Sequence, residues 1–265
     1  MCHLQIFSFN APFLVVSINA CAFPAIPKPS LARPGGECVR ILDVTEPVLV
    51  LASNSPRRRE LLSLGGWAFD TRPAVVDESQ QPGEAPAAYV LRLAESKARA
   101  CASSARAGEI LLAADTAVMD GQVLLGKPKD LAEAVAMLQT LRGHVHQVLT
   151  GLAALRLSDG ALVTDLCITN VPMRDYRDDE IEAYVASGDP LDKAGAYAIQ
   201  HPGFHPVESL NGCYASVMGL PLCHLTRSLR KLGLAPITDI AAQCQSTLSY
   251  ACPISSAVLR GEMLG

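Results

Sequence analysis

From Glu46 to Leu234 the sequence alternates short apolar runs with stretches of helical periodicity, and no other feature restricts the fold as strongly. Short apolar runs bounded by turn residues are typical of buried strands, whereas apolar side chains three and four residues apart form one face of a helix. An alternation of the two patterns is typical of a sheet packed against helices. We therefore expect an α/β domain over residues 46–234.

Local signals predict the individual elements. The run 48–52 predicts a buried strand, and Ser55 followed by Pro56 predicts the N-cap and first residue of a helix. Asp130 and Glu133 predict the cap of another helix, as an acidic variant of the capping box. The remaining expected elements are helices at 87–105, 134–141, 178–187 and 221–232 and strands at 110–119, 122–125, 147–157 and 162–173.

The ends of the chain lack these patterns. Within residues 1–45 an apolar run precedes the first lysine or arginine, Lys28, whereas a secretory signal has its basic residues first. We expect an unstructured extension or a start codon placed too early, with a targeting segment as the alternative. The tail 235–265 has no strong period and is expected to be peripheral. Inside the domain, Asn211 and Gly212 predict a hairpin turn.

Charge and cysteine content restrict the class of partner. The formal net charge of −4 argues against a broad electrostatic grip on duplex nucleic acid. The nine cysteines form no C-x-x-C pair, which favours reduced thiols and a cytoplasmic location. Asn10, Pro12 and Asn19 flank the short apolar run 13–18 and argue against a membrane span. We expect a small anionic ligand as partner, without nucleic acid polymer or membrane.

The segment 51–59 (LASNSPRRR) joins a strand to a helix whose first turn carries three arginines. Free N–H groups and the dipole at a helix N-terminus favour an anion, and a guanidinium can bind phosphate oxygens through two parallel hydrogen bonds. We interpret Ser53, Arg57 and Arg58 as phosphate-binding residues, although successive helical residues lie about 100° apart and cannot all face one ligand. A solvated basic first turn is the alternative.

Asp115 lies in the apolar strand pattern 110–119. An unpaired buried carboxylate costs several kcal/mol, so this group must meet a cation, carry a proton or lie at an opening in the sheet. A divalent metal bound to nucleotide phosphates would satisfy it, and a nearby water could then lose a proton for attack on phosphorus. A strand-end aspartate that caps a turn is the alternative.

Further polar residues can complete such a site. Lys97 falls on the apolar stripe of its helix and Lys127 follows a predicted hairpin, so either can neutralise phosphate charge, although a snorkelling lysine explains Lys97 almost as well. Lys193 adds a cation in a glycine-containing loop that leads to Gln200, whose amide can both donate to and accept from a base edge. The chain has no GxxxxGK[ST] sequence, which excludes P-loop kinases and GTPases.

Together these motifs resemble the Maf family of septum-formation-type nucleotide pyrophosphatases. The matching motifs are 51–62 (LASNSPRRRELL), 76–78 (VDE), 92–98 (RLAESKA), 114–116 (ADT), 126–128 (GKP), 150–151 (TG), 191–197 (LDKAGAY) with Gln200, and 219–222 (GLPL). The resemblance implies a Maf/ITPase-like α/β fold, with an elongated mixed sheet flanked by helices and a cleft between two lobes. It also implies dependence on a divalent metal, Mg²⁺ or Mn²⁺, and a homodimer in many members.

The resemblance assigns roles to the predicted residues. It implies that Asp115 accepts a proton and that polar groups surround the phosphates and metal, namely Ser53, Arg57, Glu78, Lys97 and Lys127. Glu78 and Asp115 are the implied metal ligands. Arg57, Thr116 and Gln200 match positions that separate substrate subgroups. Lys97 and Lys127 are expected to act with Asp115 in catalysis.

The expected reaction is hydrolysis of dTTP and UTP, and of modified pyrimidine nucleotides, to a monophosphate and pyrophosphate. In the sister branch, which acts on 7-methyl-GTP, tryptophan usually stands where this chain has Arg57. The stretch 201–206 (HPGFHP) and Cys213 depart from the family pattern and bear on base preference. A pyrophosphatase for 7-methyl-GTP or another non-standard nucleotide, and a non-catalytic nucleotide-binding regulator of septum formation, are the alternatives.

Overall fold

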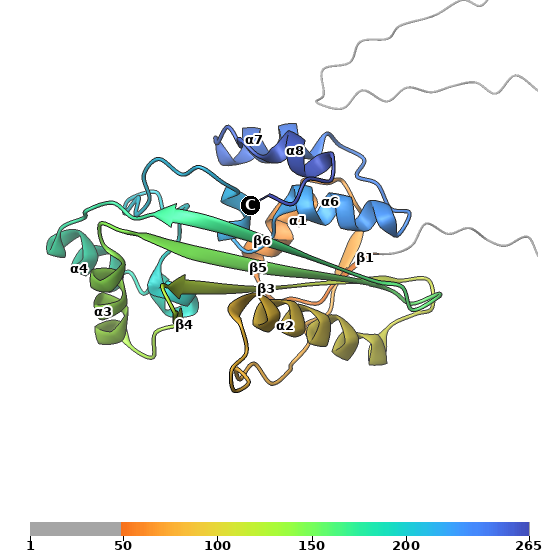
Figure 1. Cartoon of the computed structure of the whole chain (residues 1–265), viewed down its shortest axis with the longest axis horizontal. Coiled ribbons are helices and arrows are strands. Elements are labelled where there is room, and N and C mark those ends of the chain that lie inside the picture. The colour runs from red at the N-terminus through yellow and green to blue at the C-terminus, as the bar shows by residue number, and fades with distance from the viewer. Residues whose placement is uncertain (1–48, 265) are drawn as a thin grey trace, which may run out of the picture. The chain divides into compact units, whose positions relative to one another are not determined.

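The computed structural model of this chain describes residues 49–264, so the extension expected over residues 1–45 lies outside the described residues. Its centre is a six-stranded sheet in the order β2-β1-β3-β5-β6, in which β4 pairs with β3 (Figure 1). β1 is parallel to β2 and β3, and the other neighbouring strands are antiparallel. The strands are β1 (Leu49–Leu51), β2 (Phe69–Thr71), β3 (Ile110–Asp120), β4 (Val123–Leu125), β5 (Val145–Arg156) and β6 (Leu162–Pro172). The expected α/β class with a mixed sheet is confirmed.

Helices cover both faces of this sheet. In Figure 1, α2 lies along one side of β3 and β5, and α6, α7 and α8 lie on the other side. The α-helices are α1 (Pro56–Ser63), α2 (Pro86–Cys101), α3 (Leu131–Leu141), α4 (Asp178–Ala186), α5 (Tyr214–Val217), α6 (Leu222–Lys231), α7 (Ile240–Leu248) and α8 (Ser255–Leu259). Short 3-10 helices are η1 (Ala102–Ser104), η2 (Asp189–Asp192) and η3 (Ala194–Ala196). Within the described residues, every helix is too short or too polar to cross a membrane.

The long strand β3 supplies side chains to two cores, one on each face of the sheet. Ile110, Leu112 and Ala114 are buried in the core that includes α6. Leu111 and Ala113 are buried in the core beneath α2. Because side chains alternate between the two faces of a strand, Asp115 faces α2, like Leu111 and Ala113, and Thr116 faces away from α2.

One edge of β3 is open along part of its length. β1 pairs only with residues 110–112 of β3, and β4 pairs only with residues 118–120. Along residues 113–117, β3 therefore has β5 on one side and, among the described residues, no strand on the other. A polar side chain in this stretch can reach solvent without leaving the sheet.

Two helix N-caps that the sequence predicts are confirmed. The side-chain oxygen of Ser55 accepts from Arg58 N at 3.4 Å at the start of α1, and Pro56 is the first helical residue. At α3, Asp130 Oδ1 accepts from Glu133 N at 2.8 Å. Each bond satisfies a backbone donor that has no partner within the helix.

The hairpin turn expected at Asn211 and Gly212 is wrong. This segment leads into α5 and joins no pair of strands. Tyr250, from the C-terminal tail, satisfies its backbone groups: the phenol oxygen accepts from Gly212 N at 3.2 Å and lies 3.0 Å from Leu210 O. A partner so far away in the sequence leaves no local signal.

The tail beyond residue 234 forms helices α7 and α8, which the sequence pattern does not predict. Both helices pack against α6, with Ile240 and Val258 buried. Arg227 of α6 donates to Glu262 O at 2.6 Å, and His224 Nε2 lies 2.8 Å from Leu264 O. The tail thus covers a helix that would otherwise expose apolar surface.

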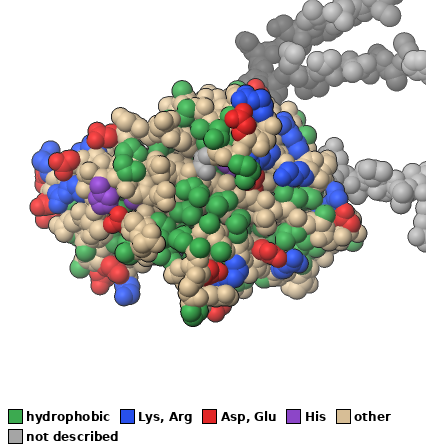
Figure 2. Space-filling model, in the orientation of Figure 1, with side chains coloured by type: hydrophobic (Ala, Val, Ile, Leu, Met, Phe, Trp, Pro, Cys, Tyr) green, Lys and Arg blue, Asp and Glu red, His purple; other side chains and the backbone are tan. Residues whose placement is uncertain are grey.

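The far end of the sheet is rich in ion pairs. In Figure 2, acidic and basic side chains are interspersed over the end of the molecule that carries α3 and α4. Arg142 pairs with Asp178 at 2.9 Å, and Arg174 with Glu180 at 2.7 Å. These pairs join α4 to the residue that follows α3 and to the segment that follows β6.

Candidate active site

A cavity of about 680 Å³ lies at the open edge of β3. It is bounded by the loop between β1 and α1, by α2, by the loop after β4, and by the segment from η2 to residue 200. Every side chain that the sequence analysis assigned to the site lines this cavity: Ser53, Arg57, Arg58, Glu78, Lys97, Asp115, Thr116, Lys127, Lys193 and Gln200. The fold therefore gathers residues that are up to about 150 positions apart in the chain.

Asp115 and Lys97 form the centre of the site. Asp115 continues the series of β3 side chains that face α2, and Lys97 projects from α2, so their charged groups meet with Nζ 2.6 Å from Asp115 Oδ1. Lys97 Nζ lies equally close to Glu78 Oε1, at 2.6 Å. One ammonium group thus bridges two carboxylates.

The surroundings shift the pKa values of Asp115 and Glu78 in opposite directions. Burial raises the pKa of Asp115, and the charge of Lys97 only partly offsets this effect. The hydrogen bond from Lys97 lowers the pKa of the more exposed Glu78. A desolvated carboxylate with a raised pKa is a stronger base than an ordinary aspartate, which suits proton transfer.

Gly151 of β5 allows α2 to approach the sheet. It pairs with Asp115 across the ladder, and a Cβ atom at this position would lie 2.6 Å from the carbonyl oxygen of Val90. Only glycine leaves room for the backbone of α2 at this distance. The close approach sets how far Lys97 reaches over β3.

Arg58 is held at the start of α1 by three hydrogen bonds. Its Nε donates to Gly219 O at 2.9 Å, and its terminal nitrogens donate to Thr116 Oγ1 at 3.3 Å and to Ser53 Oγ at 3.5 Å. Thr116 lies on the β3 face opposite Asp115. Its Oγ1 is 3.0 Å from Thr150 Oγ1, and this hydrogen bond holds the Thr116 hydroxyl in place. The guanidinium is thereby fixed in place before any ligand arrives.

The three arginines of α1 have different positions. Arg57 lies at the rim of the cavity with its Nη1 3.6 Å from Asp192 Oδ2, whereas Arg59 is exposed and does not line the cavity. Burial lowers the pKa of Arg58, and the charge of Asp115 opposes this shift. Of the two cavity-lining arginines, Arg58 is thus the desolvated one, and Arg57 lies at the rim.

Lys193 is paired with acidic residues in the wall of the cavity. Its Nζ donates to Asp189 Oδ1 at 2.9 Å and to Asp192 Oδ1 at 2.5 Å, and the side chain is only 8% exposed. Neither aspartate is among the site residues that the sequence predicts. Their signal was present as acidic residues one and four positions before the lysine. The charge of Lys193 is therefore largely compensated within the protein.

The sequence comparisons identify the family. The family model described as "Maf-like protein" matches residues 48–232. The chain belongs to the Maf family. A dTTP/UTP pyrophosphatase of Anaeromyxobacter dehalogenans (strain 2CP-C) is 49% identical to this Maf chain over 189 residues, covering 71% of the chain and 95% of the relative.

Further similar proteins come from other organisms. A dTTP/UTP pyrophosphatase of Geobacter sulfurreducens is 45% identical over 185 residues, covering 70% of the Maf chain and 96% of the relative. Among solved structures, a HAM1 protein from Coxiella burnetii matches 49% of this chain and 74% of its own, with 15% identity and a TM-score of 0.36.

The carboxylates of the Maf site fit a divalent cation in part. Glu78 and Asp115 present oxygen ligands, the type that Mg²⁺ and Mn²⁺ prefer. Within residues 49–264, no group of three or more His, Cys, Asp or Glu side chains is arranged to hold a metal. A cation here would need further oxygen ligands from phosphate and water, which is the usual way in which Mg²⁺ binds with a nucleotide.

Proposed function

We propose that this Maf protein hydrolyses dTTP and UTP to the nucleoside monophosphate and pyrophosphate. The observation that carries the proposal is the bridge from Lys97 to Asp115 and Glu78, set in a cavity that also holds the N-terminus of α1 and its arginines. The similar proteins named dTTP/UTP pyrophosphatase support the choice of substrate. A base, fixed cations and a helix N-terminus are what an attack on phosphorus requires.

The triphosphate would lie across the N-terminus of α1. Arg58 offers a positive charge whose position is fixed by Gly219, Thr116 and Ser53, so little rearrangement accompanies binding. Arg57, at the rim, can leave Asp192 for a phosphate oxygen, because an ion pair 3.6 Å long at the surface is weak. Orientation and charge neutralisation would supply most of the catalysis.

In the chemical step, a water oxygen attacks the α-phosphorus, and the bond from this phosphorus to the oxygen bridging the β-phosphorus breaks. Asp115 takes the proton from the attacking water, and the bridging oxygen leaves as part of pyrophosphate. Lys97 and Lys127, which both line the cavity, stabilise the negative charge that develops on the leaving group.

Glu78 and Asp115 would hold a divalent cation, Mg²⁺ or Mn²⁺, together with the phosphates. When bound, such a cation neutralises phosphate charge and orients the triphosphate. Asp115 has two carboxylate oxygens, and only Oδ1 contacts Lys97. One carboxylate oxygen of Asp115 is thus free of the hydrogen bond to Lys97.

Product analysis with purified protein tests the proposal. With Mg²⁺ or Mn²⁺, dTTP and UTP should yield monophosphate and pyrophosphate faster than 7-methyl-GTP or ATP. Asp115→Asn should lower turnover by about 10²–10⁴-fold while the protein stays folded, because the proton acceptor is lost and the side chain keeps its size. Asp120→Asn, a change of the same type at the end of the same strand, should keep wild-type turnover. Diphosphate and orthophosphate as products, or an active Asp115→Asn variant, would refute this mechanism.

A further inference from the structure

Tyr184 of α4 lies behind the cavity wall formed by residues 197–200. The ring is 3% exposed, and the hydroxyl oxygen accepts from Ala198 N at 3.0 Å while donating to Asp189 Oδ2 at 2.8 Å. Burial, together with Asp189, raises the pKa of Tyr184, so the hydroxyl keeps the proton it donates. Both hydrogen-bonding functions of this hydroxyl are thus used, one of them on the cavity wall itself.

Gln200 lies in a turn whose two ends both contact Tyr184. The turn is closed by His201 N donating to Ala198 O at 3.1 Å. The first end, Ala198, bonds to the Tyr184 hydroxyl, and the other end, His201, packs its ring against the Tyr184 ring with centroids 4.7 Å apart. Between them, Gln200 is exposed and lines the cavity.

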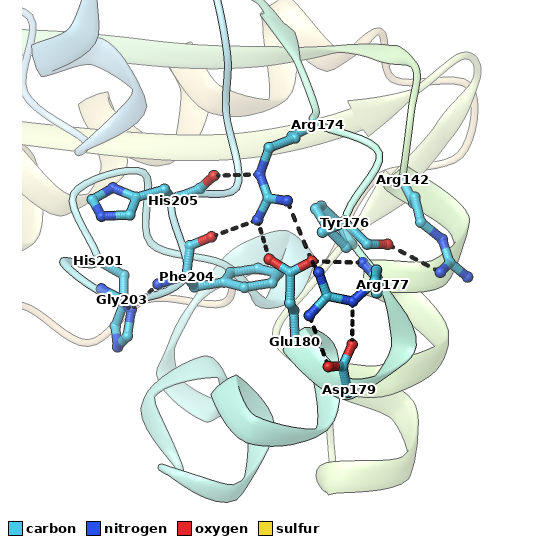
Figure 3. Close-up of polar contacts among 10 residues, drawn as sticks. All are labelled: Arg142, Arg174, Tyr176, Arg177, Asp179, Glu180, His201, Gly203, Phe204 and His205. Carbon is cyan, nitrogen blue, oxygen red and sulfur yellow. Dashed lines mark hydrogen bonds and ion pairs between the residues drawn. The ribbon is translucent and has the colours of Figure 1, made fainter.

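The loop 201–206 fixes the outer end of this turn. His201 Nδ1 accepts from Phe204 N at 2.9 Å, and the Phe204 ring stacks on Tyr184 with centroids 4.4 Å apart and an interplanar angle of 11°. Figure 3 shows Arg174 between Glu180 and the carbonyl groups of Phe204 and His205. The guanidinium donates to these oxygens at 2.9 and 3.2 Å. The loop is therefore held from both sides, although it contains glycine and two prolines.

We propose that Tyr184 is a positioning residue that fixes the amide of Gln200 for recognition of the nucleotide base. A glutamine amide both donates and accepts, so its orientation decides which base edge it can pair with. The stack of His201, Tyr184 and Phe204 sets that orientation through the turn 198–201. The inference rests on the proposed function, since it concerns the selectivity of that same cavity.

The test compares Tyr184→Phe with Tyr176→Phe. Both tyrosines are buried, both pack on Phe204, and each loses one hydroxyl, but the Tyr176 hydroxyl donates to Leu138 O of α3 and does not contact the cavity wall. The readout is the ratio of kcat/KM for dTTP to kcat/KM for GTP. We expect this ratio to fall about tenfold in Tyr184→Phe, because Ala198 N loses its acceptor, and to stay at the wild-type value in Tyr176→Phe. Partial unfolding lowers both kcat/KM values equally and leaves the ratio unchanged.

Two further measurements separate the inference from the proposed function. Dissociation constants for the α,β-methylene analogues of dTTP and GTP, from titration calorimetry, give the same selectivity ratio without turnover. A wild-type protein that releases no pyrophosphate refutes the proposed function, while the ratio of the two dissociation constants still decides the role of Tyr184. Phe204→Leu, which removes the stack but keeps the Tyr184 hydroxyl, should lower the ratio in the same direction.

In a Gln200→Ala background, Tyr184→Phe should have no further effect on the ratio, because the two residues act in one chain of contacts. An unchanged ratio in both Tyr184→Phe and Phe204→Leu would overturn the inference. So would an equal loss in Tyr184→Phe whether or not Gln200 is present.

Discussion

At the scale of single residues, Lys97 has two separable effects. It compensates the charge of buried Asp115, and it faces the space where pyrophosphate would leave. Lys97→Met should lower kcat/KM by about 100-fold and the free energy of unfolding by about 2 kcal/mol, because a desolvated carboxylate is left without its cation. Turnover assays and urea unfolding measure the two effects.

The double variant Lys97→Met with Asp115→Asn distinguishes these effects. With the carboxylate gone, the free energy of unfolding should return close to the wild-type value while turnover stays lost. Arg99→Met, on the same helix but 56% exposed and paired with Glu95, should change neither quantity by much. Stability that does not recover in the double variant would contradict the charge-pairing argument.

A second residue makes the fold sensitive to acid. His146 of β5 is buried, its Nε2 lies 2.8 Å from the hydroxyl of cavity-lining Tyr197, and burial lowers the pKa of His146 to about 4. In the unfolded chain His146 binds a proton near pH 6.5, whereas in the folded protein it binds one only near pH 4. The free energy of unfolding therefore falls as the pH drops through this window. The loss from this one group is about 3 kcal/mol.

His146→Gln should remove this part of the acid sensitivity. Between pH 7 and pH 4 its free energy of unfolding should fall by about 3 kcal/mol less than that of the wild type. Denaturant unfolding at several pH values measures the difference. His144→Gln changes an exposed histidine beside the same strand and serves as the control. Parallel stability curves for wild type and His146→Gln would show that the buried imidazole does not cause the loss.

At the scale of elements, the packing of α2 on β5 sets the position of Lys97, a proposed catalytic residue. A methyl group at residue 151 must push α2 away from the sheet, since it would meet the backbone of Val90 and not a movable side chain. Gly151→Ala should therefore cost about 1–3 kcal/mol of stability and also lower turnover, because Lys97 moves with α2. Thermal unfolding and steady-state kinetics test this prediction.

Gly108→Ala provides the control for that substitution. A Cβ atom at Gly108 meets nothing within 4 Å, and its backbone needs no left-handed conformation. This variant should keep both stability and turnover. A Gly151→Ala protein with wild-type kinetics would show that the separation of α2 from β5 does not control the site.

The elements that the sequence predicts are those with signals inside a few residues. Ser55 and Pro56 mark the start of α1, and Asp130 marks the start of α3, because a cap acts on the adjacent backbone. The hairpin turn predicted at Asn211 is wrong because the Tyr250 hydroxyl, 39 positions later in the chain, forms hydrogen bonds with the backbone of the two neighbouring residues, Leu210 and Gly212. Helices α7 and α8 are stabilised mainly by packing on α6, which sequence periodicity does not reveal.

The sequence could predict which residues line the candidate site, but not which contacts they make with one another. The cost of burying a carboxylate indicates Asp115, and the helix N-terminus indicates the arginines, from the sequence alone. Which arginine faces inward depends on Gly219 O, contributed from the far side of the fold. Likewise, the pairing of Lys193 with two aspartates appears only once η2 has folded.

At the scale of the whole described body, Arg227 joins three regions that are distant in the chain. Its guanidinium binds Asp165 of β6 through two nitrogens, at 2.5 and 2.6 Å, and Glu262 O of the tail through the third. Asp165 is almost fully buried, and the paired guanidinium helps to keep its pKa low against the effect of burial. The sheet, α6 and the C-terminal tail are thus held at a single point.

Arg227→Met should destabilise the protein by about 3–5 kcal/mol, because it leaves the Asp165 carboxylate buried without a cation and frees the tail from α6. The double variant with Asp165→Asn should recover part of this loss, since no unpaired charge then remains. Arg230→Met, an exposed position one turn further along α6, should cost less than about 0.5 kcal/mol. Urea unfolding gives these free energies, and limited proteolysis reports on the tail. Cleavage after residue 234 should accelerate in Arg227→Met and in the double variant, which both lack the bond to Glu262 O, but not in Arg230→Met. Equal cleavage rates in all variants would mean that the apolar contacts of Ile240 and Val258 hold the tail without Arg227.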